Sequence, residues 1–247
     1  MNAADADRRG GIFGATVFAF VGVAILIGLG VWQLDRKVWK ENLIATTTAR
    51  LAGAPVPLPP PARWPQLTAA ADEYTRVKFS AAFLPGESAL VYTAGSAFRP
   101  DVQGAGYWVL TPARLAGGGI VVVDRGFVPA DRKTAAAAAP VGVADIVGVM
   151  RWPDRPGLFT PAADVKTNTW YLRDSTAIAT AKNWSNAAPF YIEQETPVPP
   201  GGLPKPGKLV VALPDNHLQY AITWFGLAAG LAVVYGVWLS GRGRRTA

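Results

Sequence analysis

The sequence predicts a membrane protein of the α+β class, in which two transmembrane helices flank an antiparallel β-rich domain with a barrel-like or sandwich-like form. Half of the 247 residues are hydrophobic and only 17% are charged, which is too apolar for an ordinary soluble domain. Two uncharged runs, residues 10–34 and 218–240, are each long enough to cross a bilayer as a helix. Between them, short runs of β-type composition alternate with Pro/Gly turn signals.

Residues 1–9 form a short polar N-terminus, and residues 10–34 form the first predicted transmembrane helix. A cleaved signal peptide also begins with basic residues. Two features favour a retained anchor: the apolar run exceeds the usual signal-peptide core, and no small-x-small cleavage site precedes residue 35. The helix is expected to continue beyond the membrane, because four residues recur at helical spacing: Trp32, Arg36, Trp39 and Leu43.

Residues 35–216 are predicted to form the β-rich domain, with Pro-rich linkers. Residues 55–65 contain six prolines and are expected to be an extended linker rather than a helix. Composition predicts strands at residues 74–83, 88–94, 107–111, 120–124, 127–128, 141–150, 189–194 and 208–213. A short helix over residues 176–182 follows a capping Asp174 or Ser175, and residues 197–207 form a second Pro/Gly loop. Within the strand at 141–150, Gly142 and Gly148 are candidate bulges or crowded points.

Residues 217–240 form the second predicted transmembrane helix, and residues 241–247 form the C-terminus. Gly226 and Gly230 have the small-xxx-small spacing that permits close packing against the glycine-containing first helix. Arginines near both chain ends predict that both termini are cytoplasmic. The β-rich domain is then extracytoplasmic, which for a bacterial chain means periplasmic and attached to the inner membrane.

Composition excludes several kinds of site. The chain has no cysteine, which excludes disulfides, thiol nucleophiles, iron–sulfur clusters and thiolate metal sites. With one histidine and one internal methionine, a copper or zinc site would depend mainly on carboxylates. A haem needs only an axial protein ligand, so it stays possible. The basic residues behind the net charge of +7 are scattered or flank the apolar runs. This distribution indicates contact with membrane lipid, and it predicts no nucleic-acid partner.

The only histidine, His217, lies where the second helix enters the membrane. Tyr220 and Trp224 follow it on one predicted helix face, and the outer end of the first helix supplies three more residues at the same depth: Trp32, Gln33 and Arg36. An imidazole here is a candidate axial ligand for haem iron, with the aromatic rings packing a macrocycle. Arg36, Lys37 or an arginine from the β-rich domain is a candidate partner for the propionates. Alternatively, the histidine only caps the helix and the aromatics form an interfacial belt.

No competing catalytic arrangement is visible, so an enzyme is not predicted. A Ser/His/Asp triad elsewhere is excluded, because His217 is the only histidine. The carboxylate pairs Asp72/Glu73 and Glu193/Glu195 are interpreted as solvated surface.

Five stretches in order resemble the Surfeit-locus-protein-one family, whose members are cytochrome oxidase assembly factors of bacterial and inner mitochondrial membranes. They are GVWQLDRKVWKENLI at 30–44, GYWVLTP at 106–112, VVDRGFVP at 122–129, NTWYLRD at 168–174 and PDNHLQYAITWFGL at 214–227. They are spread over residues 30–227, which is most of the chain. The departures are Asp124 and Asp215, which stand where the family pattern usually has asparagine.

The resemblance implies an assembly factor of the respiratory chain that binds haem a transiently through His217 and aids its insertion into the catalytic subunit of cytochrome c oxidase. A haem a synthesis enzyme is a further implied partner, and a quinol oxidase is an alternative client. A second hypothesis is a structural chaperone that docks the nascent subunit without ligating haem, through Tyr107, Trp108, Arg125 and Trp170. A third is a two-span envelope scaffold unrelated to oxidases.

Overall fold

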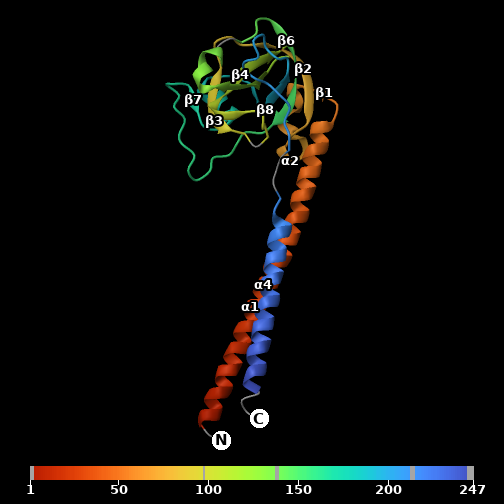
Figure 1. The fold of residues 1–247 in the computed structure, drawn as a ribbon. Coiled ribbons are helices and arrows are strands. Elements are labelled where there is room, and N and C mark those ends of the chain that lie inside the picture. The colour runs from red at the N-terminus through yellow and green to blue at the C-terminus, as the bar shows by residue number, and fades with distance from the viewer. Residues whose placement is uncertain (1–2, 97, 137–138, 212–214, 244–247) are drawn as a thin grey trace. The chain divides into compact units, whose positions relative to one another are not determined.

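The structure is a computed structural model that describes residues 3–96, 98–136, 139–211 and 215–243. The chain forms two compact units, residues 1–45 with 213–247, and residues 46–212 (Figure 1). The first unit contains two helices that are long and apolar enough to cross a membrane, and the second contains the β-structure. The predicted fold class is therefore confirmed.

The two long helices are α1 (Ala3–Ala52) and α4 (His217–Gly243). Only 6% of the most apolar window of each helix is buried, as expected for surfaces that face lipid rather than a protein core. Helix α1 continues well past residue 34, in agreement with the helical spacing of its aromatic and basic residues. The points at which the helices leave the membrane stay a prediction.

The two helices contact each other at Gly22 and Gly30 of α1 rather than at Gly226 and Gly230 of α4. A Cβ atom at Gly30 would meet the Phe225 ring at 2.6 Å, and one at Gly22 would meet Leu231 at 2.9 Å. Gly226 and Gly230 have nothing within 4 Å, so the prediction that this pair mediates close packing is wrong. The reason is helical phase: the buried alanines of α4, at positions 221 and 228, lie on the face of Phe225, and the two glycines do not.

The β unit is built on a closed five-stranded barrel (Figure 1). Its strands pair in the order β2-β6-β8-β5-β4, and pairing of β2 with β4 closes it. The barrel strands are β2 (Arg76–Phe83), β4 (Gln103–Leu115), β5 (Ile120–Pro129), β6 (Val143–Arg151) and β8 (Ala187–Thr196). Three further strands extend the sheet: β1 (Val56–Pro57), β3 (Ala89–Gly95) and β7 (Thr169–Trp170).

All barrel pairings are antiparallel except that of β5 with β8. A parallel pair needs a long crossover between its strands. Here the chain between β5 and β8 supplies it, and it includes η2 (Ala130–Ala136), β6, β7 and α3 (Ser175–Ala181). Asp174 caps α3 as expected, accepting a hydrogen bond from the amide of Ala177 at 2.9 Å.

Two hydrophobic clusters lie on opposite faces of β5 and β8. Val121, Val123 and Phe190 belong to a cluster that draws on all five barrel strands, which identifies it as the barrel interior. Val122 and Tyr191 belong to the other cluster, with Trp108, Trp170 and the helix α3. Both faces of these two strands are therefore buried, and charged residues within them are removed from water.

Two local predictions are wrong. The Pro-rich stretch contains a 3-10 helix, η1 (Pro61–Gln66), because Trp64 is buried in the barrel cluster and its indole N–H bonds to the carbonyl of Pro59 at 2.9 Å. The strand expected at 208–213 does not form over its described residues 208–211. There the backbone amide of Val210 donates to the carbonyl of Phe98, but residues 208–211 do not form a strand. The short η2 and α2 (Ala69–Asp72) complete the helices.

Candidate functional site

The first candidate site lies on the helical unit, where His217 begins α4. Its backbone N–H is capped by the Asp215 carboxylate at 3.0 Å, and its side chain is partly buried. Ring atom Nδ1 lies 2.7 Å from Oε1 of Gln33, a side chain of α1 that is only 9% exposed. The structure thus brings together one residue from each of the two stretches that the sequence analysis paired.

This contact orients the imidazole. An amide oxygen can only accept a hydrogen bond, so the bond forms in the tautomer that carries its proton on Nδ1. In the neutral ring Nε2 then keeps its lone pair. A metal-binding histidine is commonly oriented by donating its other ring N–H to an oxygen acceptor, and Gln33 has that role here.

The other predicted site residues separate into two groups. Trp224 lies two turns along α4 from His217 and is partly buried; its indole Nε1 has no hydrogen-bond partner among the described residues. Tyr220 and Trp32 are exposed instead. Arg36 is also exposed and its guanidinium stacks over the Trp39 ring at 3.8 Å. The predicted face of α4 is therefore not uniform: His217 contacts α1, Trp224 is partly buried, and Tyr220 is exposed.

A second group of polar residues lies in the β unit, and the sequence analysis missed it. The interpretation of Glu193 and Glu195 as solvated surface is wrong, because these residues are 1% and 6% exposed. Glu195 is held by the Arg76 guanidinium, with Nη2 to Oε2 at 2.6 Å. The physical reason is that β8 is buried on both faces, so even its alternating polar residues are enclosed.

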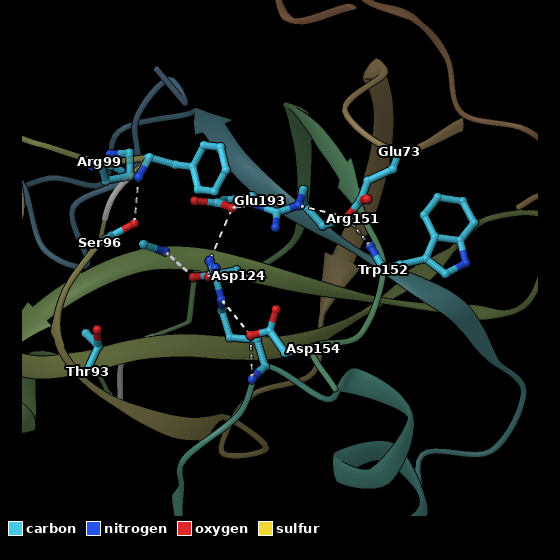
Figure 2. A network of polar contacts seen from close by, with 12 residues as sticks. Glu73, Thr93, Ser96, Arg99, Asp124, Arg151, Trp152, Asp154 and Glu193 are labelled. Atoms are coloured by element: carbon cyan, nitrogen blue, oxygen red, sulfur yellow. Dashed lines mark hydrogen bonds and ion pairs between the residues drawn. The ribbon is translucent and has the colours of Figure 1, made fainter. Parts of the chain in front are cut away.

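Glu193 is the centre of a buried ionic network (Figure 2). Its Oε2 accepts hydrogen bonds from Nη1 of Arg151 and Nη1 of Arg173, both at 3.2 Å. Arg151 also reaches the Glu73 carboxylate at 3.3 Å, and Arg173 lies 3.6 Å from Asp154. Two arginines thus bridge carboxylates contributed by several elements, which is the geometry that makes enclosed charges tolerable.

Asp124 joins this network from the neighbouring strand, where it is the register partner of Glu193. It is fully buried; its Oδ1 accepts the Gly126 N–H at 3.0 Å, and its Oδ2 lies 3.5 Å from Nη1 of Arg173. Burial, followed by the charge of Glu193, raises the pKa of Asp124 to about 7. Glu193 has the closer contacts to the arginines, at 3.2 Å to both, whereas Asp124 lies 3.5 Å from Arg173.

The residues proposed for docking in the β unit are mostly core residues. Trp108, Trp170 and Arg125 are buried, and Tyr107 is partly buried against Tyr92, with ring centroids 5.9 Å apart. Burial of the first three removes them from any docking surface on the folded unit. The β unit therefore gives less support to subunit docking through these side chains than the sequence suggested.

Comparison with known proteins relates this architecture to one family. A model of the SURF1 family matches residues 20–229. A SURF1-like protein from Monosiga brevicollis is 34% identical over 241 residues, which cover 92% of this chain and 87% of the relative. Surfeit locus protein 1 from Mus musculus is 31% identical, covering 86% of this chain and 71% of the relative. Surfeit locus protein 1 from Homo sapiens is also 31% identical, and the match covers 84% of this chain and 72% of the relative.

Proposed function

Because the chain belongs to the SURF1 family, we propose that it is an assembly factor for cytochrome c oxidase that holds haem a at the membrane through His217. Family membership implies the assembly role, and the family is one of assembly factors rather than known catalysts. The finer steps are the proposal: haem a binding, and its insertion into the catalytic subunit. The observation that carries them is the bond between His217 and Gln33.

The residues at this site fit a haem better than a bare metal ion. No group of three or more His, Asp or Glu side chains able to hold a metal occurs among the described residues. A porphyrin supplies four of the ligands of its iron and leaves the protein to provide an axial one. His217 offers Nε2 for that bond, with Nδ1 oriented by Gln33. The unpartnered indole N–H of Trp224 offers a donor to an acceptor group on the ligand.

A single histidine ligand is suited to transfer. Gln33 orients the imidazole of His217 by accepting the Nδ1–H. His217 would hold the haem through a single protein bond, and a group held in this way could be passed on to histidines of the catalytic subunit. The exposed aromatics Trp32 and Tyr220 add apolar surface at the same helix ends. The exposed guanidinium of Arg36 is available to carboxylates.

The orientation in the membrane is part of the proposal. Two spans place both termini on one side, and the arginines at the chain ends assign that side to the cytoplasm. The β unit is then periplasmic in a bacterial inner membrane. Because the chain has no cysteine, single-cysteine variants report topology cleanly. In intact cells an impermeant maleimide should label Asp131→Cys, while Thr246→Cys should need permeabilised membranes; the reverse pattern would contradict the orientation.

The haem proposal is tested by co-expression with the haem a synthesis enzymes. The purified wild-type protein should show a haem a spectrum, and His217→Ala should lose it. Gln219→Ala is the matched control, because it changes an exposed side chain of the first turns of the same helix. Equal haem occupancy in wild type and His217→Ala would refute ligation and leave the chain as a structural chaperone for the oxidase subunit.

A further inference from the structure

The chain between β6 and β7, residues 152–168, forms a loop that carries two exposed apolar side chains. Figure 1 shows this loop in teal, extending away from the barrel beside β7. Leu158 is 92% exposed and Phe159 is 90% exposed, and we call this pair the apolar tip. Single exposed apolar residues are ordinary on protein surfaces, whereas large neighbours presented together indicate contact with another apolar surface.

A tight turn holds the apolar tip outward. The backbone amide of Thr160 donates to the carbonyl of Gly157 at 3.2 Å, and the amide of Gly157 donates to Oγ1 of Thr160 at 2.8 Å. Pro156 and Pro161 flank the turn and restrict the backbone on each side of it. The two apolar residues occupy the central positions of this turn, so their exposure follows from the backbone conformation.

The two ends of the loop are fixed to the β unit. At one end the amide of Asp154 donates to the carbonyl of Arg173 at 3.4 Å, and the amide of Arg173 donates to the Asp154 carboxylate at 3.3 Å. At the other end Asp164 and Thr169 exchange two amide–carbonyl hydrogen bonds, both of 2.9 Å. The loop is therefore preorganised, and contact with a partner does not have to order its ends.

The charges near the apolar tip match an anionic surface. Arg155 and Lys166 are exposed, and neither forms an ion pair with a residue that the structure describes. Of the two carboxylates in the loop, Asp154 is paired with Arg173 at 3.6 Å. Asp164 is exposed, and its Oδ1 accepts the amide N–H of Lys166 at 3.0 Å. Two unpaired cations against one exposed carboxylate leave the loop with a net positive charge.

We propose that this loop inserts its apolar tip into the surface of the lipid bilayer and so gives the β unit a membrane contact of its own. Both ends of the β unit continue into helices of membrane length, so a bilayer is the apolar phase that always accompanies it. Leu158 and Phe159 enter the boundary between headgroups and acyl chains, and Arg155 and Lys166 meet the phosphates of anionic lipids. The inference does not depend on haem binding at His217.

The small size of the apolar tip favours lipid over a protein partner. A stable protein interface buries about 800 Å² on each partner, with some 20 or more residues a side. Two side chains on one turn supply only a small part of such an area. Attachment to a bilayer needs no complementary surface, because its strength depends on the apolar area that is buried and on attraction to anionic headgroups.

A fluorescent label tests the position of the loop in the full-length protein in lipid nanodiscs. Because the chain has no cysteine, NBD can be attached at Ala162→Cys alone, an exposed position beside the turn. Doxyl-labelled lipid in the disc should quench this label. Val141→Cys is the matched control, because Val141 is a fully exposed apolar residue outside the loop, and its label should stay unquenched. Absence of quenching at Ala162→Cys would overturn lipid insertion in favour of a protein partner, and equal quenching at both positions would overturn the assignment to this loop.

A second experiment tests whether the apolar tip causes the insertion. The double substitution Leu158→Asn with Phe159→Asn changes two side chains that are exposed, so the β unit should fold as before. Quenching of the label at Ala162→Cys should fall to the level of the control position. Val141→Asn removes an equally exposed apolar side chain elsewhere and should leave the quenching unchanged. Quenching that persists in the double variant would refute the role given to the apolar tip.

The lipid headgroup is tested with Arg155→Gln combined with Lys166→Gln. In discs that contain phosphatidylglycerol, the ratio of unquenched to quenched label should rise about fivefold or more, the effect of one basic residue at an anionic surface. In discs of phosphatidylcholine alone, the same variant should match the parent loop. An equal response in both lipids would contradict the assignment of anionic headgroups to these two residues.

Discussion

Substitution of Asp124 by asparagine should remove a specific part of the pH dependence of stability of the β unit. Asparagine has nearly the same shape and keeps the oxygen that accepts the Gly126 N–H. It cannot ionise beside Glu193, the neighbour whose charge opposes ionisation of Asp124. The variant therefore isolates the free-energy cost of placing a second negative charge in the buried network.

The magnitude follows from the pKa of Asp124, which is about 7 in the folded chain against the ordinary value of 3.8. A carboxyl whose folded pKa is raised stabilises the fold while it is protonated, and this contribution is lost as the pH rises through the folded pKa. Between about pH 5 and about pH 8 the loss is roughly 3 kcal/mol for one group with these two pKa values. Wild type should therefore lose that much more stability than Asp124→Asn over this interval.

The assay is urea unfolding of the full-length protein in detergent, followed by tryptophan fluorescence at several pH values. Trp108, Trp170 and Trp184 are buried in the β unit and report its unfolding. Asp131→Asn serves as the control, because it removes an exposed carboxylate. Unfolding free energies of Asp124→Asn and wild type that fall in parallel from about pH 5 to about pH 8 would refute the reasoning.

Three further predictions follow from single contacts. Gly148→Ala places a Cβ atom 2.5 Å from the backbone oxygen of Glu193 and should lower the unfolding free energy by about 1–3 kcal/mol in the same urea assay. Asp174→Ala removes the cap of α3 and should cost about 1 kcal/mol, whereas Asp174→Asn should cost little. Gln33→Leu removes the acceptor of the imidazole N–H, so we expect haem a retained after purification to fall about tenfold or more, with Gln33→Glu retaining more than Gln33→Leu.

Composition and local patterns were sufficient for the elements that depend on near neighbours. Uncharged runs of membrane length identified both long helices, and alternating β-type segments located all five barrel strands. The cap at Asp174 was also predictable, because it follows from the residue type at one position. Of the two glycines named in the strand at 141–150, Gly148 is crowded, whereas Gly142 has nothing within 4 Å. The pairing of the entry of α4 with the outer end of α1 followed from equal depth in the membrane, and the structure adds the contact between His217 and Gln33.

Tertiary structure decided what depends on distant partners. Barrel closure buries both faces of β8. Glu193, which the sequence predicted to be a surface carboxylate, therefore lies at the centre of a buried ionic network. The 3-10 helix around Trp64 forms because the barrel interior accepts the indole ring, and Pro-rich composition alone does not reveal it.

The sequence by itself determined that this chain has two membrane-length helices around a β-rich domain, and one histidine that can serve as a strong metal ligand. These follow from hydrophobicity, strand propensity and residue counting, which are local properties. Only the tertiary structure decided that Gln33 lies against the imidazole of His217 and which carboxylates are removed from water. Each of these is set by side chains far apart in sequence, whose hydrogen bonds and burial exist only once the barrel has closed or the helices have packed.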